Sequence, residues 1–138
     1  CNCGRKGCFE AYGSMKRFKE KIQAEFKLPD GDGKTVKNFI VQNENNEKLK
    51  LIIDKYIDNL AIGIINLINI FEPEVIGIGG SFVYFADIFI PRLKEKILSN
   101  NLLFNRRDDI IINAAVLGND AGIIGAAMLG LLHKINLR

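Results

Sequence analysis

Hydrophobic residues recur along most of the chain with the spacing of amphipathic helices. The clearest stretch runs through Ile53, Ile57, Leu60 and Ile64, which follow one another at intervals of three or four residues. This spacing places apolar side chains on one continuous helix face. It predicts a long helix that ends near Phe71.

The first part of the chain also has helical periodicity, broken by turn residues. Residues 8–26 are expected to be helical, with Gly13 a weak point and Ser14 a cap for a second segment. The proline, glycines and aspartates of residues 29–33 predict a turn, and residues 35–42 a short helix. The chain is therefore expected to open with helices rather than strands.

Two short apolar runs later in the chain have the length of buried strands. Residues 75–78 form the first and end in glycines, and a second strand is centred on residues 110–112. A helix over residues 85–97 lies between them, and a final helix follows, capped by Asn119 or Asp120. This order predicts an α/β fold, helix-rich and with about two strands.

Length and composition agree with one domain that spans residues 1–138. A chain of 138 residues, 48% of them hydrophobic, can bury a core. Two strands make a weak sheet by themselves, because three are the usual minimum for independent stability. We therefore expect the chain to be the C-terminal part of a longer protein whose N-terminal half is absent.

Charge and hydropathy argue against two classes of partner. The net charge is +3, from 19 basic and 16 acidic residues that are largely interspersed, so no nucleic-acid partner is expected. The most apolar run, residues 60–71, contains Asn66 and Asn69 and is shorter than the roughly 20 residues that span a bilayer. Because no secretory signal is visible, a cytoplasmic location without a membrane partner is expected.

All three cysteines lie within the first eight residues, in the spacing C-x-C-x4-C. Cys1, Cys3 and Cys8 offer three soft ligands on a glycine-containing loop, which suits Zn²⁺ and leaves one tetrahedral position for a fourth ligand. The alternative is a set of reduced, inert thiols. The only histidine, His133, is expected on the surface near the end of the last helix, so a fourth ligand would have to precede Cys1.

Three segments of the chain resemble a known family. The first ten residues, CNCGRKGCFE, resemble the C-x-C-G-x-x-G-C-x-E motif of the ROK family of bacterial repressors, open reading frames and sugar kinases. The segment EPEVIGIGGS is similar to the strand and glycine turn at that family's nucleotide site, and AAVLGNDAGIIGAAMLG to its closing segment. The resemblance thus extends across nearly the whole chain.

The resemblance implies a fold and a metal site. The fold is that of an actin-like, hexokinase-type (ribonuclease H-like) ATPase domain, with a zinc loop over residues 1–10 followed by the C-terminal nucleotide- and sugar-binding subdomain. Cys1, Cys3 and Cys8 match the family's ligands for a structural zinc, which is completed by an upstream histidine. In such proteins the metal supports the sugar site.

The resemblance also implies binding residues. Glu10 matches a glutamate that accepts hydrogen bonds from sugar hydroxyls, although an acidic residue in a first helical turn is more often a solvated partner of the helix dipole. Gly79, Gly80 and Ser81 match contacts to the nucleotide, although without the resemblance they would be only a strand-to-helix turn. Gly118 and Asn119 are further candidates at the border of that pocket.

The function implied is ATP-dependent phosphorylation of a hexose by a glucokinase-like sugar kinase, with ATP and Mg²⁺ bound by the whole protein. The family's catalytic aspartate and main phosphate-binding motifs precede the cysteines, so no catalytic residue is expected in this chain, and the chain alone should be inactive.

An alternative is a sugar-responsive ROK repressor that binds DNA through an added domain. A third hypothesis is a zinc-stabilised interaction domain. Homo-oligomers are common in the family and are expected here.

Overall fold

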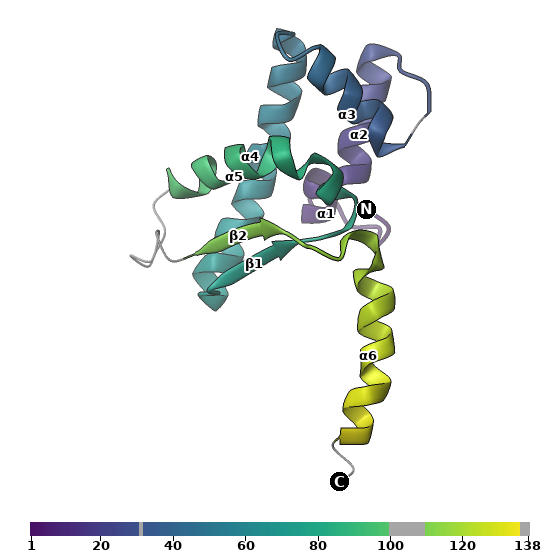
Figure 1. Cartoon of the computed structure of the whole chain (residues 1–138). Helices are drawn as coiled ribbons and strands as arrows, with labels where there is room; N and C mark the ends of the chain where they lie inside the picture. Colours follow the sequence, from purple (N-terminus) through teal and green to yellow (C-terminus); the bar gives the residue numbers. More distant parts are fainter. Residues whose placement is uncertain (31, 100–109, 136–138) are drawn as a thin grey trace.

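The computed structural model describes residues 1–30, 32–99 and 110–135 of the chain (Figure 1). In chain order the elements are α1 (Phe9–Gly13), α2 (Met15–Phe26), α3 (Gly33–Gln42), α4 (Glu47–Phe71), β1 (Val75–Ile78), the 3-10 helix η1 (Gly80–Phe85), α5 (Ala86–Leu98), β2 (Ile111–Ala114), the 3-10 helix η2 (Gly118–Asp120) and α6 (Ala121–Ile135). The predicted helix-rich α/β fold with two strands is confirmed.

The helix boundaries follow the local capping chemistry. The predicted helix over residues 8–26 is divided at Ser14, whose backbone is extended with ψ 126°; Ser14 occupies the predicted cap position of α2, but its side chain makes no capping hydrogen bond. Helix α3 begins two residues before the predicted start, because the Asp32 carboxylate accepts hydrogen bonds from the backbone N–H groups of Lys34 and Thr35. Helix α4 is capped in the same way, because the Asn46 side chain accepts a hydrogen bond from the Leu49 N–H at 3.0 Å.

Helix α4 forms the centre of a helical body with α2, α3 and α5. Aromatic rings from three of these helices meet in its core. The ring centroids of Phe18 and Tyr56 lie 4.6 Å apart, and Phe89 meets Phe18 edge-on at 5.3 Å. Phe85 and Phe89 are stacked at 5.4 Å and are both fully buried. The long apolar stripe of α4 is therefore a core face, as its periodicity predicts.

The two strands form a parallel sheet in which Val75 lies opposite Ile111. Strand β1 has the predicted bounds, whereas β2 is displaced by one to two residues toward the C-terminus. One face of the sheet packs against the helical body, where Ile112 is 3% exposed. On the other face Val75 and Ile111 are 60% and 51% exposed. The sheet is thus covered on one face by the described part of the chain.

Helix α6 follows β2 through η2 and extends away from the helical body (Figure 1). A methyl group added at Gly122 or Gly125 would meet no atom within 4 Å in the described part of the chain. Within the described residues, no helix combines the length and apolar character needed to cross a membrane.

Candidate metal, sugar and nucleotide sites

The three cysteine side chains converge at the N-terminus. The Sγ atoms of Cys1 and Cys3 lie 2.8 Å apart, those of Cys3 and Cys8 lie 3.5 Å apart, and all three fall within 4.8 Å of one another. The structure therefore places the three predicted ligands next to one another, and their binding of a metal stays a prediction. They are the only such group of potential metal ligands among the described residues.

Two glycines allow the loop to close on itself. Gly4 and Gly7 both have φ of +77°, a left-handed conformation that other residues adopt only with strain. The Gly4 N–H donates a hydrogen bond to the Cys1 carbonyl at 3.1 Å, which forms a tight turn between the first two cysteines. The backbone thus brings together three side chains that would otherwise point apart.

The donor set fits a soft divalent ion. Zinc bonded to thiolates at about 2.3 Å in a tetrahedron separates its sulfur atoms by about 3.8 Å. The Cys3–Cys8 distance of 3.5 Å is close to this value, whereas the Cys1–Cys3 distance of 2.8 Å is shorter, so Cys1 and Cys3 would move apart around an ion. The pKa of the Cys3 thiol lies below its usual value, mainly because the Arg5 backbone stabilises the thiolate by hydrogen bonding, with a smaller contribution from Cys8. A thiolate is the form that binds metal. Cys1 and Cys8 are half-buried and Cys3 is exposed, so the loop remains accessible to solvent.

Glu10 follows the last cysteine by two residues and lies in α1 with an exposed side chain. Its position depends on Phe9, the residue between it and Cys8. A methyl group added at Gly63 of α4 would come within 2.2 Å of the Phe9 ring, so the ring sits directly against the α4 backbone. Phe9 therefore fixes α1, and with it both Cys8 and Glu10, on the helical body.

Sequence reasoning missed this contact between Phe9 and α4. A visible signal was the glycine at position 63, which stands within the apolar periodicity of a long helix where glycine is unfavourable by about 1 kcal/mol relative to alanine. A glycine at such a position often marks a close approach by another group. Its distant partner could not be identified from the sequence, because Phe9 and Gly63 are separated by 54 residues.

The turn after β1 carries the three predicted nucleotide contacts. Gly79 is extended, and Gly80 has φ of +67° as the chain turns into η1. A methyl group at Gly79 would meet the Ala115 side chain at 3.7 Å, which is ordinary contact, so this turn lies beside the exit of β2. Ser81 is half-buried at the start of η1. The structure thus brings the three residues together in one turn.

The turn after β2 lies next to the turn after β1. Gly118 begins η2 with φ of +54°, and η2 contacts η1. In open α/β sheets, ligands bind at the carboxyl ends of parallel strands, which is where both turns lie. The side chains of Asn119 and His133 lie outside the described residues, so their predicted roles stay predictions. In the view of Figure 1, the cysteine loop also lies toward this end of the sheet.

Comparison with known proteins agrees with these features. The model of the ROK family matches residues 1–132, and the chain belongs to this family. Its helix-rich fold with two parallel strands is consistent with part of the actin-like ATPase domain that the sequence resemblance implies.

The relatives include sugar kinases and repressors. The chain is 31% identical to a glucokinase from Thermotoga maritima over 94% of the chain and 44% of the relative. It is 33% identical to an N-acetyl-D-glucosamine kinase from Aliivibrio salmonicida over 95% of the chain and 41% of the relative. A xylose repressor from Caldicellulosiruptor bescii is 27% identical over 70% of the chain and 27% of the relative. The chain thus spans less than half the length of each of these relatives.

Proposed function

We propose that this chain is the C-terminal part of an ATP-dependent hexose kinase of the glucokinase type. The observation that carries the proposal is the convergence of three cysteine sulfurs, within 4.8 Å, on a loop that leads directly into Glu10. The glucokinase and N-acetylglucosamine kinase relatives, each matched along more than nine-tenths of this chain, support a kinase over other classes. Such a protein would act in the cytoplasm, as a homo-oligomer, on a sugar and ATP.

Cys1, Cys3 and Cys8 would hold a structural zinc ion, with a fourth ligand from outside this chain. The ion would supply no chemistry to the reaction and would instead fix the loop that precedes α1. Zinc loading is expected to be one ion per chain and to fall to near zero in the Cys3→Ser variant, measured by atomic absorption on the full-length protein. One ion per chain in Cys3→Ser would contradict the assignment.

Glu10 would accept hydrogen bonds from two sugar hydroxyls, because a carboxylate offers two acceptor oxygens in a fixed geometry. Gly79, Gly80 and Ser81 would approach the nucleotide, since a backbone without a Cβ at Gly79 and Gly80 allows close contact and Ser81 begins a helical turn. Mg²⁺ would be bound with the phosphates of ATP. The chain itself would contribute positioning, and the catalytic base would come from the N-terminal half.

The proposal is tested by sugar-dependent ADP formation in the full-length protein, with glucose, N-acetylglucosamine and N-acetylmannosamine as substrates. Glu10→Gln is expected to lower kcat/KM by about 100-fold, because it removes a charged acceptor at the substrate. Glu20→Gln, an exposed change one helix away, is the matched control and should retain activity. The isolated 138-residue chain should form no ADP. Full activity in Glu10→Gln, or turnover by the isolated chain, would overturn the assignment.

A ROK repressor is the second candidate, because the xylose repressor relative matches 70% of the chain. In that case the cysteine loop and Glu10 would serve a sugar-sensing domain, and DNA would be bound by another part of the protein. The full-length protein would then form no ADP with any of the three sugars, and addition of a sugar would release it from DNA in a gel-shift assay. These results distinguish the two candidates.

A further inference from the structure

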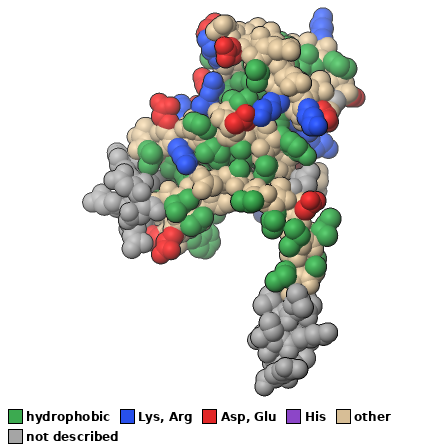
Figure 2. Space-filling model, viewed as in Figure 1, with side chains coloured by type: hydrophobic (Ala, Val, Ile, Leu, Met, Phe, Trp, Pro, Cys, Tyr) green, Lys and Arg blue, Asp and Glu red, His purple; other side chains and the backbone are tan. Residues whose placement is uncertain are grey.

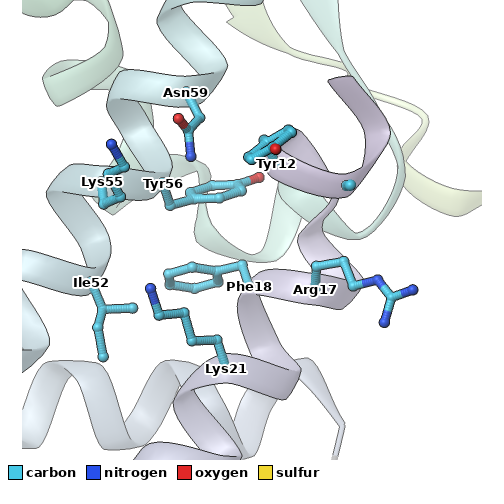
Figure 3. A pocket seen from close by; sticks show the side chains of 9 residues that line it. Tyr12, Arg17, Phe18, Lys21, Ile52, Lys55, Tyr56 and Asn59 are labelled. Carbon is cyan, nitrogen blue, oxygen red and sulfur yellow. The ribbon is translucent and has the colours of Figure 1, made fainter. Parts of the chain in front are cut away.

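An open cavity of about 270 Å³ lies between α1, α2 and α4 (Figure 3). Its floor is apolar and rigid, because the side chains of Phe18, Ile52 and Tyr56 are 4%, 7% and 5% exposed. The Tyr56 hydroxyl donates a hydrogen bond to the Gly13 carbonyl at 3.2 Å, so it is already satisfied. These side chains close the bottom of the cavity and leave little accessible surface of their own, whereas the ring of Tyr12, which also lines the cavity, is 53% exposed.

The rim of the cavity is basic. Arg17, Lys21 and Lys55 all line it, and Arg17 is paired with Glu20 at 3.1 Å. Lys21 and Lys55 form no ion pair within the described part of the chain, and Figure 3 shows them reaching the cavity from α2 and α4 respectively. Two ammonium groups from different helices thus border one apolar floor.

No carboxylate side chain lines this cavity among the described residues, and the layout of α4 explains why. Asp54 and Asp58 are directed toward α5, where they pair with Arg92 at 3.5 Å and Lys96 at 2.8 Å. Lys55 lies on the opposite side, toward α2. The acidic side chains of this part of α4 are therefore occupied elsewhere. Glu20 neutralises Arg17 at the rim, so the rim charges that no ion pair among the described residues neutralises are those of Lys21 and Lys55.

We propose that this cavity binds a small phosphate monoester that carries one planar ring. Lysine ammonium groups are common phosphate ligands, and the ring would lie against the exposed ring of Tyr12. Asn59 and Tyr12, which also line the cavity, place an amide and a hydroxyl where they can bind polar substituents of the ring (Figure 3). None of these residues belongs to the proposed sugar and nucleotide sites, so the cavity is a separate site for an effector.

The test is isothermal titration of the full-length protein with phenyl phosphate, in the presence of glucose and a non-hydrolysable ATP analogue. We expect binding with a Kd below about 1 mM. The double variant Lys21→Gln/Lys55→Gln should weaken binding at least about fivefold, because both charge-assisted contacts are lost. Lys34→Gln/Lys94→Gln removes the same charge away from the cavity and should leave binding unchanged. Lys55→Glu, which reverses one charge, should abolish binding.

Two further ligands test the contributions of the ring and of the phosphate separately. Phenol, which has the ring without the phosphate, and inorganic phosphate, which has the anion without the ring, should each bind at least about tenfold more weakly than phenyl phosphate. Absence of binding at a phenyl phosphate concentration about ten times the expected Kd would overturn the proposal. The proposal would also be overturned if Lys34→Gln/Lys94→Gln weakened phenyl phosphate binding as much as Lys21→Gln/Lys55→Gln does. The same holds if phenol or inorganic phosphate bound as tightly as phenyl phosphate.

Discussion

The two ends of this molecule differ in how completely they bury their apolar residues. In the helical body, Ile22, Phe85 and Phe89 are fully buried by neighbouring helices. Beyond β2, Val116 is 99% exposed and Ile123 of α6 is 73% exposed. Figure 2 shows hydrophobic side chains on the described part of α6.

The difference shows that the helical body and the sheet end are stabilised in different ways. Helices α2 to α5 cover one another, so the body has a core made within this chain. Among the described residues the sheet has two strands, each with one unpaired edge, and one face carries the exposed Val75 and Ile111. Contiguous apolar surface and open strand edges generally mark places where another surface packs. Within the described residues, the sheet end therefore has less of its apolar surface covered than the helical body has.

The largest effect is expected from a cavity in the helical body. Phe89→Ala removes a fully buried ring that contacts Phe18, Tyr56 and Phe85, and should lower the free energy of unfolding by about 3–5 kcal/mol. Urea unfolding of the 138-residue chain, followed by circular dichroism, measures this loss. A loss below about 1 kcal/mol would show that the body is not the stable unit of the chain.

A smaller effect is expected where the cysteine loop joins the helical body. In Gly63→Ala the new methyl group would overlap the outer atoms of the Phe9 ring, which is 48% exposed and must move, at a cost of about 1–3 kcal/mol that the helix propensity of alanine offsets by up to about 1 kcal/mol. If the full-length protein is a sugar kinase, KM for the sugar should rise more than kcat falls, because α1 carries Glu10. Thermal unfolding and steady-state kinetics measure the two effects.

Gly122→Ala is the matched control, since its methyl group meets no described atom within 4 Å and alanine favours a helix by up to about 1 kcal/mol. It should be neutral or stabilising in the 138-residue chain. Equal destabilisation by Gly63→Ala and Gly122→Ala would contradict the proposed contact between Phe9 and α4.

Much of the helical body could be predicted from the sequence because its signals are local. The period of Ile53, Ile57 and Leu60 defines a buried helix face directly. The start of α3 was less accurate, since the capping bond of Asp32 decides it and aspartate also occurs in ordinary turns. At β2 a continuous apolar run predicted a strand but not its exact bounds, which depend on its pairing with β1.

The site was predictable to a different extent. The cysteine spacing and the glycines predicted a metal loop; the structure brings the three cysteine sulfur atoms together, and the metal itself stays a prediction. Neither Phe9 as an anchor nor the basic cavity beside Lys21 and Lys55 could be read from the sequence. Both arise from side chains that are distant along the chain and meet only through helix packing. The roles of Glu10, Gly79, Gly80 and Ser81 rest on the family resemblance and remain to be measured.

A weaker effect should come from the surface ion pair that joins α3 to α5. Lys37 lies 2.8 Å from the Asp87 carboxylate and, with a hydrogen bond as the main cause, holds the pKa of that group below its usual value of 3.8. Because Asp87 is 63% exposed, Asp87→Asn should cost less than about 1 kcal/mol at pH 7. A lowered folded-state pKa stabilises the fold above the unfolded pKa, so the difference should persist down to about pH 4 and disappear below it. Urea unfolding at pH 7 and pH 2.5 measures it, and an undiminished difference at pH 2.5 would rule out the ion pair as its source.

The smallest effect is expected at the exposed end, where it sharpens the contrast with the helical body. In Ile123→Gln, a side chain that is 73% exposed is replaced with glutamine, which also favours a helix. The free energy of unfolding of the 138-residue chain should therefore change by less than about 0.5 kcal/mol. Self-association through this apolar surface should decrease, which gel filtration over a concentration series measures. In the full-length protein the same change should destabilise by about 1–3 kcal/mol if α6 is covered there, because glutamine would then be buried in an apolar contact. An equally small effect in both forms would mean that α6 is exposed in the whole protein as well, and that the contrast between the two ends belongs to the fold itself.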